Sequence, residues 1–208
     1  MKTNHVLTRT AAAAIGALLL LGTAATAAAA ETELGNDSVD VSVDIAPLPT
    51  QGALSMTVGG SGTVLTEDGS TALVREFTGE LPTVTVTDTR APEDVPEGAG
   101  WYVVGSATAF VGSDGQPEIG ADHLGWTPRL LDGGESGLVA EGEQVNTVLD
   151  TGDDSLGLVD QEFLAITDDW AAVSTEGQWT ATADLVLKTE PTVAAGDYSA
   201  TLTLSLFE

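Results

Sequence analysis

The amino-acid sequence predicts an all-β protein, an antiparallel β-sandwich with a Greek-key-like arrangement in a single domain. Apolar and polar residues alternate along several segments, as in antiparallel strands that bury one face and expose the other. Glycine-rich and aspartate-rich turns separate these segments, and the chain of 208 residues contains 24 glycines. Only residues 161–173 have a pattern compatible with a helix. Many short strands joined by tight turns favour a sandwich.

The first 30 residues are typical of a secretory signal peptide, which we expect to be cleaved. Lys2 and Arg9 precede an apolar stretch, residues 11–21, that is too short to span a bilayer. Ala28 and Ala30 then fit an A-x-A cleavage site. We therefore expect a secreted protein that does not insert into a membrane after cleavage.

The rest of the chain is predicted to form a flexible N-terminal tail, residues 31–38, and one β domain, residues 39–208. Alternation predicts strands over residues 39–45, 54–58, 84–86, 179–187 and 198–206. Turn signals occur at Glu67–Gly69, Ser113–Gly115, Asp132–Gly134, Gly152–Asp154 and Ala195–Asp197. We find no linker that would divide this part of the chain into two domains.

The charge of the chain excludes two classes of partner. All 32 acidic residues and only four of the 6 basic residues follow residue 30, so residues 31–208 carry a formal charge of −28. Nucleic acids and anionic membranes bind to surfaces rich in lysine and arginine, which a chain with this balance cannot offer. The chain also lacks cysteine, so its stability must come from packing or from bound ions.

The sequence predicts a protein without enzymatic activity. Beyond the signal peptide it contains one histidine, His123, and no nucleophile-elbow, zinc-protease, C-x-x-C or P-loop motif. Two carboxylates need only meet in space to form a glycosidase pair, so a secreted glycan-active enzyme remains an alternative.

We expect no cofactor and no metal, with calcium as the alternative. Asp150, Asp153, Asp154 and Asp160 lie in one acidic segment, and Ser113–Gln116 is a second oxygen-rich turn. Calcium takes several oxygen ligands, often from loops of this kind. Neither segment has the spacing of an EF-hand loop, so ordinary acidic turns are the prediction.

Three aromatic residues are candidates for glycan binding, because flat aromatic faces can stack on sugar rings: Trp101, Trp126 and Tyr198. Trp126 lies in a loop-like context, His-Leu-Gly-Trp-Thr-Pro-Arg, and among these aromatic residues it is the strongest candidate for an exposed ring. Trp101 begins an apolar run, and its neighbour Tyr102 is expected to point to the opposite face. Tyr198, like Trp179, lies on the apolar row of its predicted strand, which also fits a place in the core.

The order of several motifs resembles the WxL surface domain. The first half of that domain typically has valine–x–aspartate–x–arginine, then a glycine–tryptophan strand, then a small segment that ends in phenylalanine. This chain has Val86–Arg90 (VTDTR), Gly100–Val103 (GWYV) and Thr108–Phe110 (TAF) in the same order. Residues 179–187 and 196–206 are similar to the end of the domain.

The chain departs from the family pattern at two positions. Leu204 stands where the second motif has its tryptophan, and Val103 stands where the first motif has its leucine. Both substitutions are apolar, so the interior of a strand can accommodate them.

The resemblance implies a secreted protein of Gram-positive bacteria that attaches non-covalently to the cell wall, at peptidoglycan or another glycan, and acts with other surface proteins. Anionic wall polymers would repel a chain of this charge, so attachment would need stacking, hydrogen bonds or divalent-cation bridges. The alternative function is a structural, assembly or adhesin-like module that pairs with other surface proteins through edge strands, with residues 198–206 as the exchangeable edge.

Overall fold

The structure, a computed structural model, describes residues 52–152 and 155–208. The predicted signal peptide (residues 1–30), the predicted tail (31–38) and the predicted strand over residues 39–45 lie outside these residues, as do Asp153 and Asp154. Within the described part of the chain the all-β prediction is confirmed, because antiparallel strands make up almost all of the regular structure. No helix in that part is long and apolar enough to cross a membrane.

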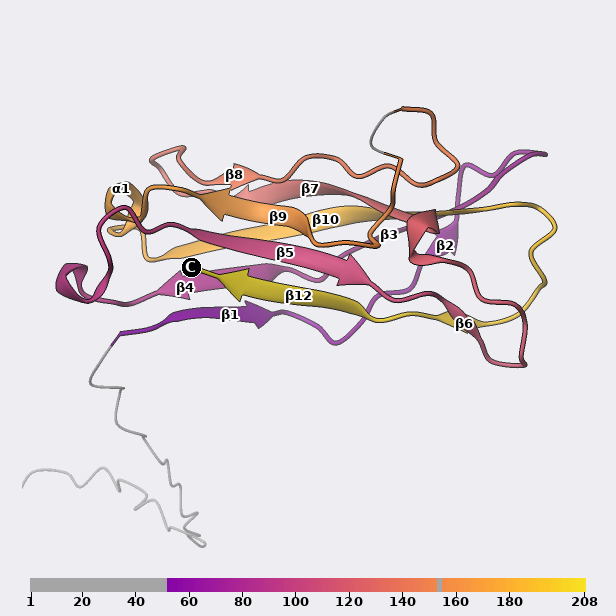
Figure 1. Cartoon of the computed structure of the whole chain (residues 1–208), viewed down its shortest axis with the longest axis horizontal. Coiled ribbons are helices and arrows are strands. Elements are labelled where there is room, and N and C mark those ends of the chain that lie inside the picture. Colours follow the sequence, from indigo (N-terminus) through magenta and orange to yellow (C-terminus); the bar gives the residue numbers. More distant parts are fainter. Residues whose placement is uncertain (1–51, 153–154) are drawn as a thin grey trace, which may run out of the picture. The chain divides into compact units, whose positions relative to one another are not determined.

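The strands form two main antiparallel sheets and one small pair (Figure 1). The first sheet contains β1 (Leu54–Val58), β2 (Thr66–Glu67), β3 (Arg75–Glu80), β4 (Val84–Asp88), β7 (Leu124–Asp132) and β10 (Gln178–Thr189). The second sheet contains β5 (Trp101–Ala107), β8 (Ala140–Glu141), β9 (Glu162–Thr167) and β12 (Leu202–Phe207). The small pair is β6 (Val111–Gly112) with β11 (Tyr198–Ser199), and the helical turns are η1 (Pro92–Asp94), η2 (Ala121–His123) and α1 (Trp170–Val173).

β10 is the central strand of the first sheet. Along one edge it pairs with β4 through its first half and with β3 through its second half, and along the other edge it pairs with β7. β1 lies outside β4, and β2 lies outside β3. In the second sheet the strand order is β12-β5-β9-β8. Consequently β1 and β12 are edge strands among the described residues, and they run side by side in Figure 1.

Tryptophan rings fill the space between the two sheets. Trp101 from β5 and Trp179 from β10 have ring centroids 5.1 Å apart, so the two sheets meet face to face at this contact. Trp126 from β7 lies against Gly105 of β5, where a Cβ atom would come within 2.6 Å of its ring. A glycine at position 105 is therefore required for the indole ring of Trp126 to fit. The prediction that Trp179 belongs to the core is confirmed.

The sequence pattern did not reveal β7, because Gly125 and Pro128 lie within it. Trp126 exchanges two backbone hydrogen bonds with Val145, on the side of β7 that faces away from β10. In an antiparallel strand the backbone groups two residues further along point to the same side. The nitrogen of Pro128 therefore faces away from β10, and the missing N–H costs no hydrogen bond to that strand.

Two predicted elements differ from the observed ones. The segment with a helical pattern, residues 161–173, is mostly the strand β9, and only the turn α1 is helical. The β-branched residues Ile166 and Thr167 favour the strand. The strand predicted over residues 198–206 is two strands, since β11 pairs with β6 while β12 pairs with β5.

Candidate functional site

Two of the three predicted binding residues are buried. Trp101 is 0 % exposed and Trp126 is 1 % exposed, so neither ring is accessible for stacking on a glycan. Trp126, the strongest candidate for an exposed ring, is instead buried, because its segment forms a strand of the first sheet and directs the ring toward β5. Neither indole N–H has a hydrogen-bond partner in the described part of the chain. Both rings therefore act as core side chains.

Tyr198 is half-buried and lies on the wall of a large groove. Its hydroxyl donates a hydrogen bond to the carbonyl oxygen of Ala194 at 2.9 Å, which fixes the position of the ring. The predicted place in the core is therefore correct only in part, since the ring packs against the core and also borders the groove.

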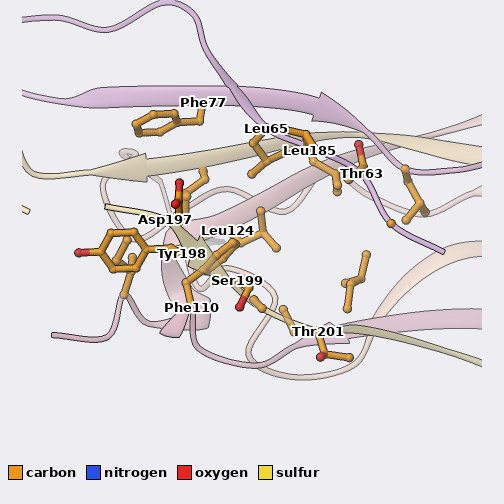
Figure 2. Close-up of a pocket in the computed structure, with 18 of the residues that line it drawn as sticks. Thr63, Leu65, Phe77, Phe110, Leu124, Leu185, Asp197, Tyr198, Ser199 and Thr201 are labelled. Atoms are coloured by element: carbon orange, nitrogen blue, oxygen red, sulfur yellow. The ribbon is translucent and has the colours of Figure 1, made fainter. Parts of the chain in front are cut away.

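The β1–β12 groove lies between these two edge strands and has a volume of about 860 Å³. Figure 2 shows Leu65, Phe77 and Leu185 on one side and Phe110 and Thr201 on the other. Aliphatic and aromatic side chains from both sheets form most of its wall. Among the residues that the structure describes, no strand covers the core of the sandwich along this side.

On the side of the groove, the backbone of β12 has no hydrogen-bond partner among the described residues. Thr108 donates its N–H to the carbonyl oxygen of Thr201, and the same register continues along β12 and β5. Bonded and non-bonded pairs alternate in an antiparallel ladder, so Leu202, Leu204 and Leu206 direct their N–H and C=O groups away from β5. Their side chains point inward and pack against the core.

β1 repeats this arrangement on the opposite side of the groove. Thr89 donates its N–H to Ala53, and Gly59 donates its N–H to Thr83, which places bonded pairs at both ends of the strand. The N–H and C=O groups of Leu54, Met56 and Val58 therefore face away from β4. Two strand edges that lack a backbone partner in the described part of the chain thus border one apolar groove.

A second surface feature is a cluster of three rings on the outer face of the second sheet, which we call the aromatic face: Tyr102, Phe163 and Phe207. Tyr102 stacks on Phe207 with ring centroids 5.2 Å apart, and it meets the edge of Phe163 at 5.5 Å. Phe163 is 45 % exposed and Phe207 is 38 % exposed. These rings come from three neighbouring strands, β5, β9 and β12.

Sequence reasoning identified only one member of the aromatic face. Tyr102 was expected to point away from the face of Trp101, and this is confirmed by the burial of Trp101 and the partial exposure of Tyr102. Phe163 and Phe207 carried no usable signal, because their approach to Tyr102 depends on which strands are neighbours. Hydroxyl side chains continue the same face along β5 and β12, namely those of Ser106, Thr203 and Ser205.

Every basic side chain in the described part of the chain is already ion-paired. The pairs are Arg75 with Glu67, Arg90 with Asp88 and Glu208, Arg129 with Glu80 and Asp184, and Lys188 with Asp150 and Glu76. A ligand that approaches the described surface therefore meets no unpaired lysine or arginine. This balance favours uncharged or basic partners over anionic ones.

The motif Val86–Arg90 forms a buried ion pair rather than a binding site. Arg90 donates hydrogen bonds to both carboxylate oxygens of Asp88, and the indole N–H of Trp170 donates to the same carboxylate at 2.8 Å. Burial raises the pKa of Asp88, but the hydrogen bonds from Arg90 outweigh it and hold the pKa below its usual range. Arg90 also binds Glu208 at 2.7 Å, which joins the end of β4 to the residue that follows β12.

Asp150, from the predicted acidic segment, and His123 both contact Lys188 of β10. Lys188 binds Asp150 at 2.6 Å, and this hydrogen bond raises the pKa of the lysine. Nδ1 of His123 lies 2.6 Å from the carbonyl oxygen of Lys188, so this nitrogen carries the hydrogen of the bond. Within residues 52–152 and 155–208 no group of three histidine, cysteine or acidic side chains could hold a metal ion. Calcium binding that involves Asp153 or Asp154 lies outside the described residues.

Comparisons with known proteins do not assign the chain to a family. No family model and no curated protein matches the chain. Among solved structures, part of a family 123 glycoside hydrolase from Clostridium perfringens, described for glycolipid glycan hydrolysis, is similar with 14 % identity and a TM-score of 0.31. The match covers 64 % of this chain and 19 % of the hydrolase. A similarity of this size establishes neither a shared activity nor a shared substrate.

Proposed function

We propose that this chain is an exported, non-enzymatic bacterial surface protein, WxL-like, that binds cell-wall glycan non-covalently through its aromatic face. The observation that carries the proposal is the exposed cluster of Tyr102, Phe163 and Phe207 on one sheet face. Three contacting rings with hydroxyl side chains beside them offer stacking surfaces and hydrogen bonds, which are the interactions that sugar rings use. These three rings take the place of Trp101 and Trp126 as candidate glycan-binding residues, because the rings of Trp101 and Trp126 are buried.

The electrostatics of the chain select among wall components. Residues 31–208 carry a formal charge of −28, and the described basic side chains are all paired. Anionic wall polymers are repelled by such a surface, whereas an uncharged glycan strand is not. We therefore expect binding to peptidoglycan glycan rather than to teichoic-acid-type polymers.

Co-sedimentation with isolated Gram-positive cell walls tests this proposal. We expect the protein to pellet with the walls, and to pellet more strongly after anionic polymers have been removed from them. Replacing Phe163 and Phe207 together by alanine should weaken binding at least about tenfold, equivalent to about 1.4 kcal/mol. The matched control is Leu131→Ala, which removes a side chain of similar exposure (47 %) from the other sheet.

Two outcomes would contradict the proposal. One is unchanged pelleting of the Phe163→Ala/Phe207→Ala protein, which would place the binding surface elsewhere. The other is a protein that stays soluble with every wall preparation. A chelator added in a parallel series separates stacking from cation bridging, because only bridging requires calcium or magnesium.

A further inference from the structure

We propose that the β1–β12 groove is a docking site for an extended strand of a partner protein, with apolar side chains at alternate positions and uncharged or basic side chains between them. This site is distinct from the aromatic face, which lies on the outer side of the second sheet. An added strand would close the open side of the sandwich.

The first argument is the backbone of the two edge strands. On one side of the groove the N–H and C=O groups of Leu202, Leu204 and Leu206 have no backbone partner among the described residues, and β1 presents a matching row on the other side. Backbone groups of this kind form the hydrogen bonds that strand addition uses. A strand in the groove can therefore continue either sheet without any change in the existing pairs.

The second argument is the alternation of the groove wall. The leucines of β12 that face away from β5 point their side chains into the sandwich, as do Leu54 and Met56 of β1. Leu65, Phe77 and Leu185 lie in the same space (Figure 2). An added strand continues the pleat of its neighbour, so every second side chain enters this apolar space. The groove volume of about 860 Å³ leaves room for a row of such side chains. This geometry requires an alternating sequence in the partner.

The third argument is charge, and it decides between a partner protein and a second copy. Among the described residues that line the groove, the charged side chains are those of Asp197 and Arg75, and Arg75 is held by Glu67 at 2.8 Å. Among the described residues, Asp197 is therefore the charged group of the groove without an ion pair, and no unpaired cation lies there to repel basic side chains of an added strand. Two copies that each carry −28 over residues 31–208 repel one another, which disfavours self-association at this site.

The experiment uses the purified protein and a synthetic peptide of about nine residues, a common strand length, that alternates valine with threonine and lysine. Two control peptides have the same composition without alternation, or glutamate in place of lysine. We expect the alternating lysine peptide to bind at least about tenfold more tightly than either control.

Hydrogen exchange of single amides reports where the peptide binds. The amides of Leu202, Leu204 and Leu206, or those of the matching row on β1, should gain protection when the peptide is present. The amides of Thr203 and Ser205 should not change, because they already face β5. A ligand that merely covered the surface would not produce this two-residue period.

A pair of matched variants tests the groove itself. Val64 borders the groove and Leu73 does not, and each is 81 % exposed. Val64→Asp should weaken peptide binding at least about tenfold, while Leu73→Asp should leave it unchanged. Both proteins should pellet with cell walls like the unaltered chain, so failure here is distinguishable from failure of the proposed glycan binding.

Several results would overturn the proposal. Equal binding of the alternating and non-alternating peptides would exclude strand addition, and so would a lack of protection on both edges. Concentration-dependent dimerisation with protection of the same amides would show that a second copy is the occupant. Val41 and Val43 belong to the strand predicted over residues 39–45, which lies outside the described residues. If the peptide binds only to the protein with Val41→Asp and Val43→Asp, the chain itself supplies the strand that occupies the groove.

Discussion

The two sides of the sandwich are built from similar alternating strands, yet one side is closed and the other is open. On the closed side, Leu158 donates its N–H to Leu124 of β7 and accepts a hydrogen bond from the N–H of Ala107 of β5, so one residue joins the two sheets. Val145 pairs with Trp126 nearby, and β8 extends the second sheet. On the open side no described segment joins β1 to β12 in this way.

This difference distinguishes the side of the sandwich that stabilises the fold from the side that carries the proposed docking groove. A segment that closes an edge must satisfy the backbone groups of both sheets and supply side chains for the gap between them. Residues 140–152 and 155–158 do this, and Val145 among them pairs with Trp126 of the core. The groove side has half-buried aliphatic residues and backbone groups without a partner in the described part of the chain, which are the properties of a surface that receives another strand.

The largest expected effect is the loss of a core tryptophan. Trp101→Ala removes a fully buried ring that packs on Trp179, and it should lower the free energy of unfolding by about 4 kcal/mol. Chemical denaturation of the variant and the unaltered protein measures this change. A loss below about 1 kcal/mol would mean that the closed side is not where the main stability lies.

The second effect concerns the ion pair that fastens one end of the open side. Asp88→Ala leaves Arg90 and Trp170 without their shared acceptor, and it should cost about 3 kcal/mol at neutral pH. Burial opposes ionisation of Asp88, but hydrogen bonds from Arg90 hold its pKa below the usual range. A lowered folded-state pKa stabilises the protein above the unfolded pKa, near 4, and this stabilisation disappears as the pH falls through the lowered value.

Urea denaturation over a pH series checks both parts of that prediction. The difference in stability between the unaltered protein and Asp88→Ala should be largest above about pH 4 and should shrink in more acidic solution. A difference that grows on acidification would contradict the assigned role of the carboxylate. Asp132→Ala, which removes an exposed acid with no ion pair among those described, serves as the control.

The third effect tests the contact between β5 and β7. Gly105→Ala adds a methyl group 2.6 Å from the ring of Trp126, where the packed core leaves no room for it to move. Overpacking of this kind should cost about 2 kcal/mol. Gly137→Ala is a surface control with open space around its Cβ position, although its positive φ adds some strain of its own. Thermal unfolding monitored by tryptophan fluorescence would show the difference.

The smallest effect is expected on the wall of the groove. Leu204→Ala shortens a half-buried side chain that already borders open space, so it should cost only about 1 kcal/mol. The measurement is the same denaturation series used for Trp101→Ala. A cost as large as that of Trp101→Ala would show that the groove is filled in solution and that both sides of the sandwich are tightly packed.

The sequence predicted the fold class well and the site poorly, and particular residues show why. The strands β1, β4 and β10 were correctly anticipated, because alternation of apolar and polar residues is a local property. β7 was missed because Gly125 and Pro128 interrupt that alternation. Whether a strand can accommodate a proline depends on which of its edges is paired, and this is decided by the neighbouring strands. The same interruption made Trp126 the strongest candidate for an exposed ring, although the ring is buried.

The amino-acid sequence by itself determined that the described chain forms antiparallel β-strands, and it determined which side chains share a face within each strand, as for Trp101 and Tyr102. Only the tertiary structure decided which strands are neighbours, and therefore that Phe163 and Phe207 meet Tyr102. It also decided which side of the sandwich is closed by Leu158 and which remains a groove. The physical reason is that side-chain alternation is set by the local backbone, whereas register and edge pairing depend on hydrogen bonds between residues far apart in the chain.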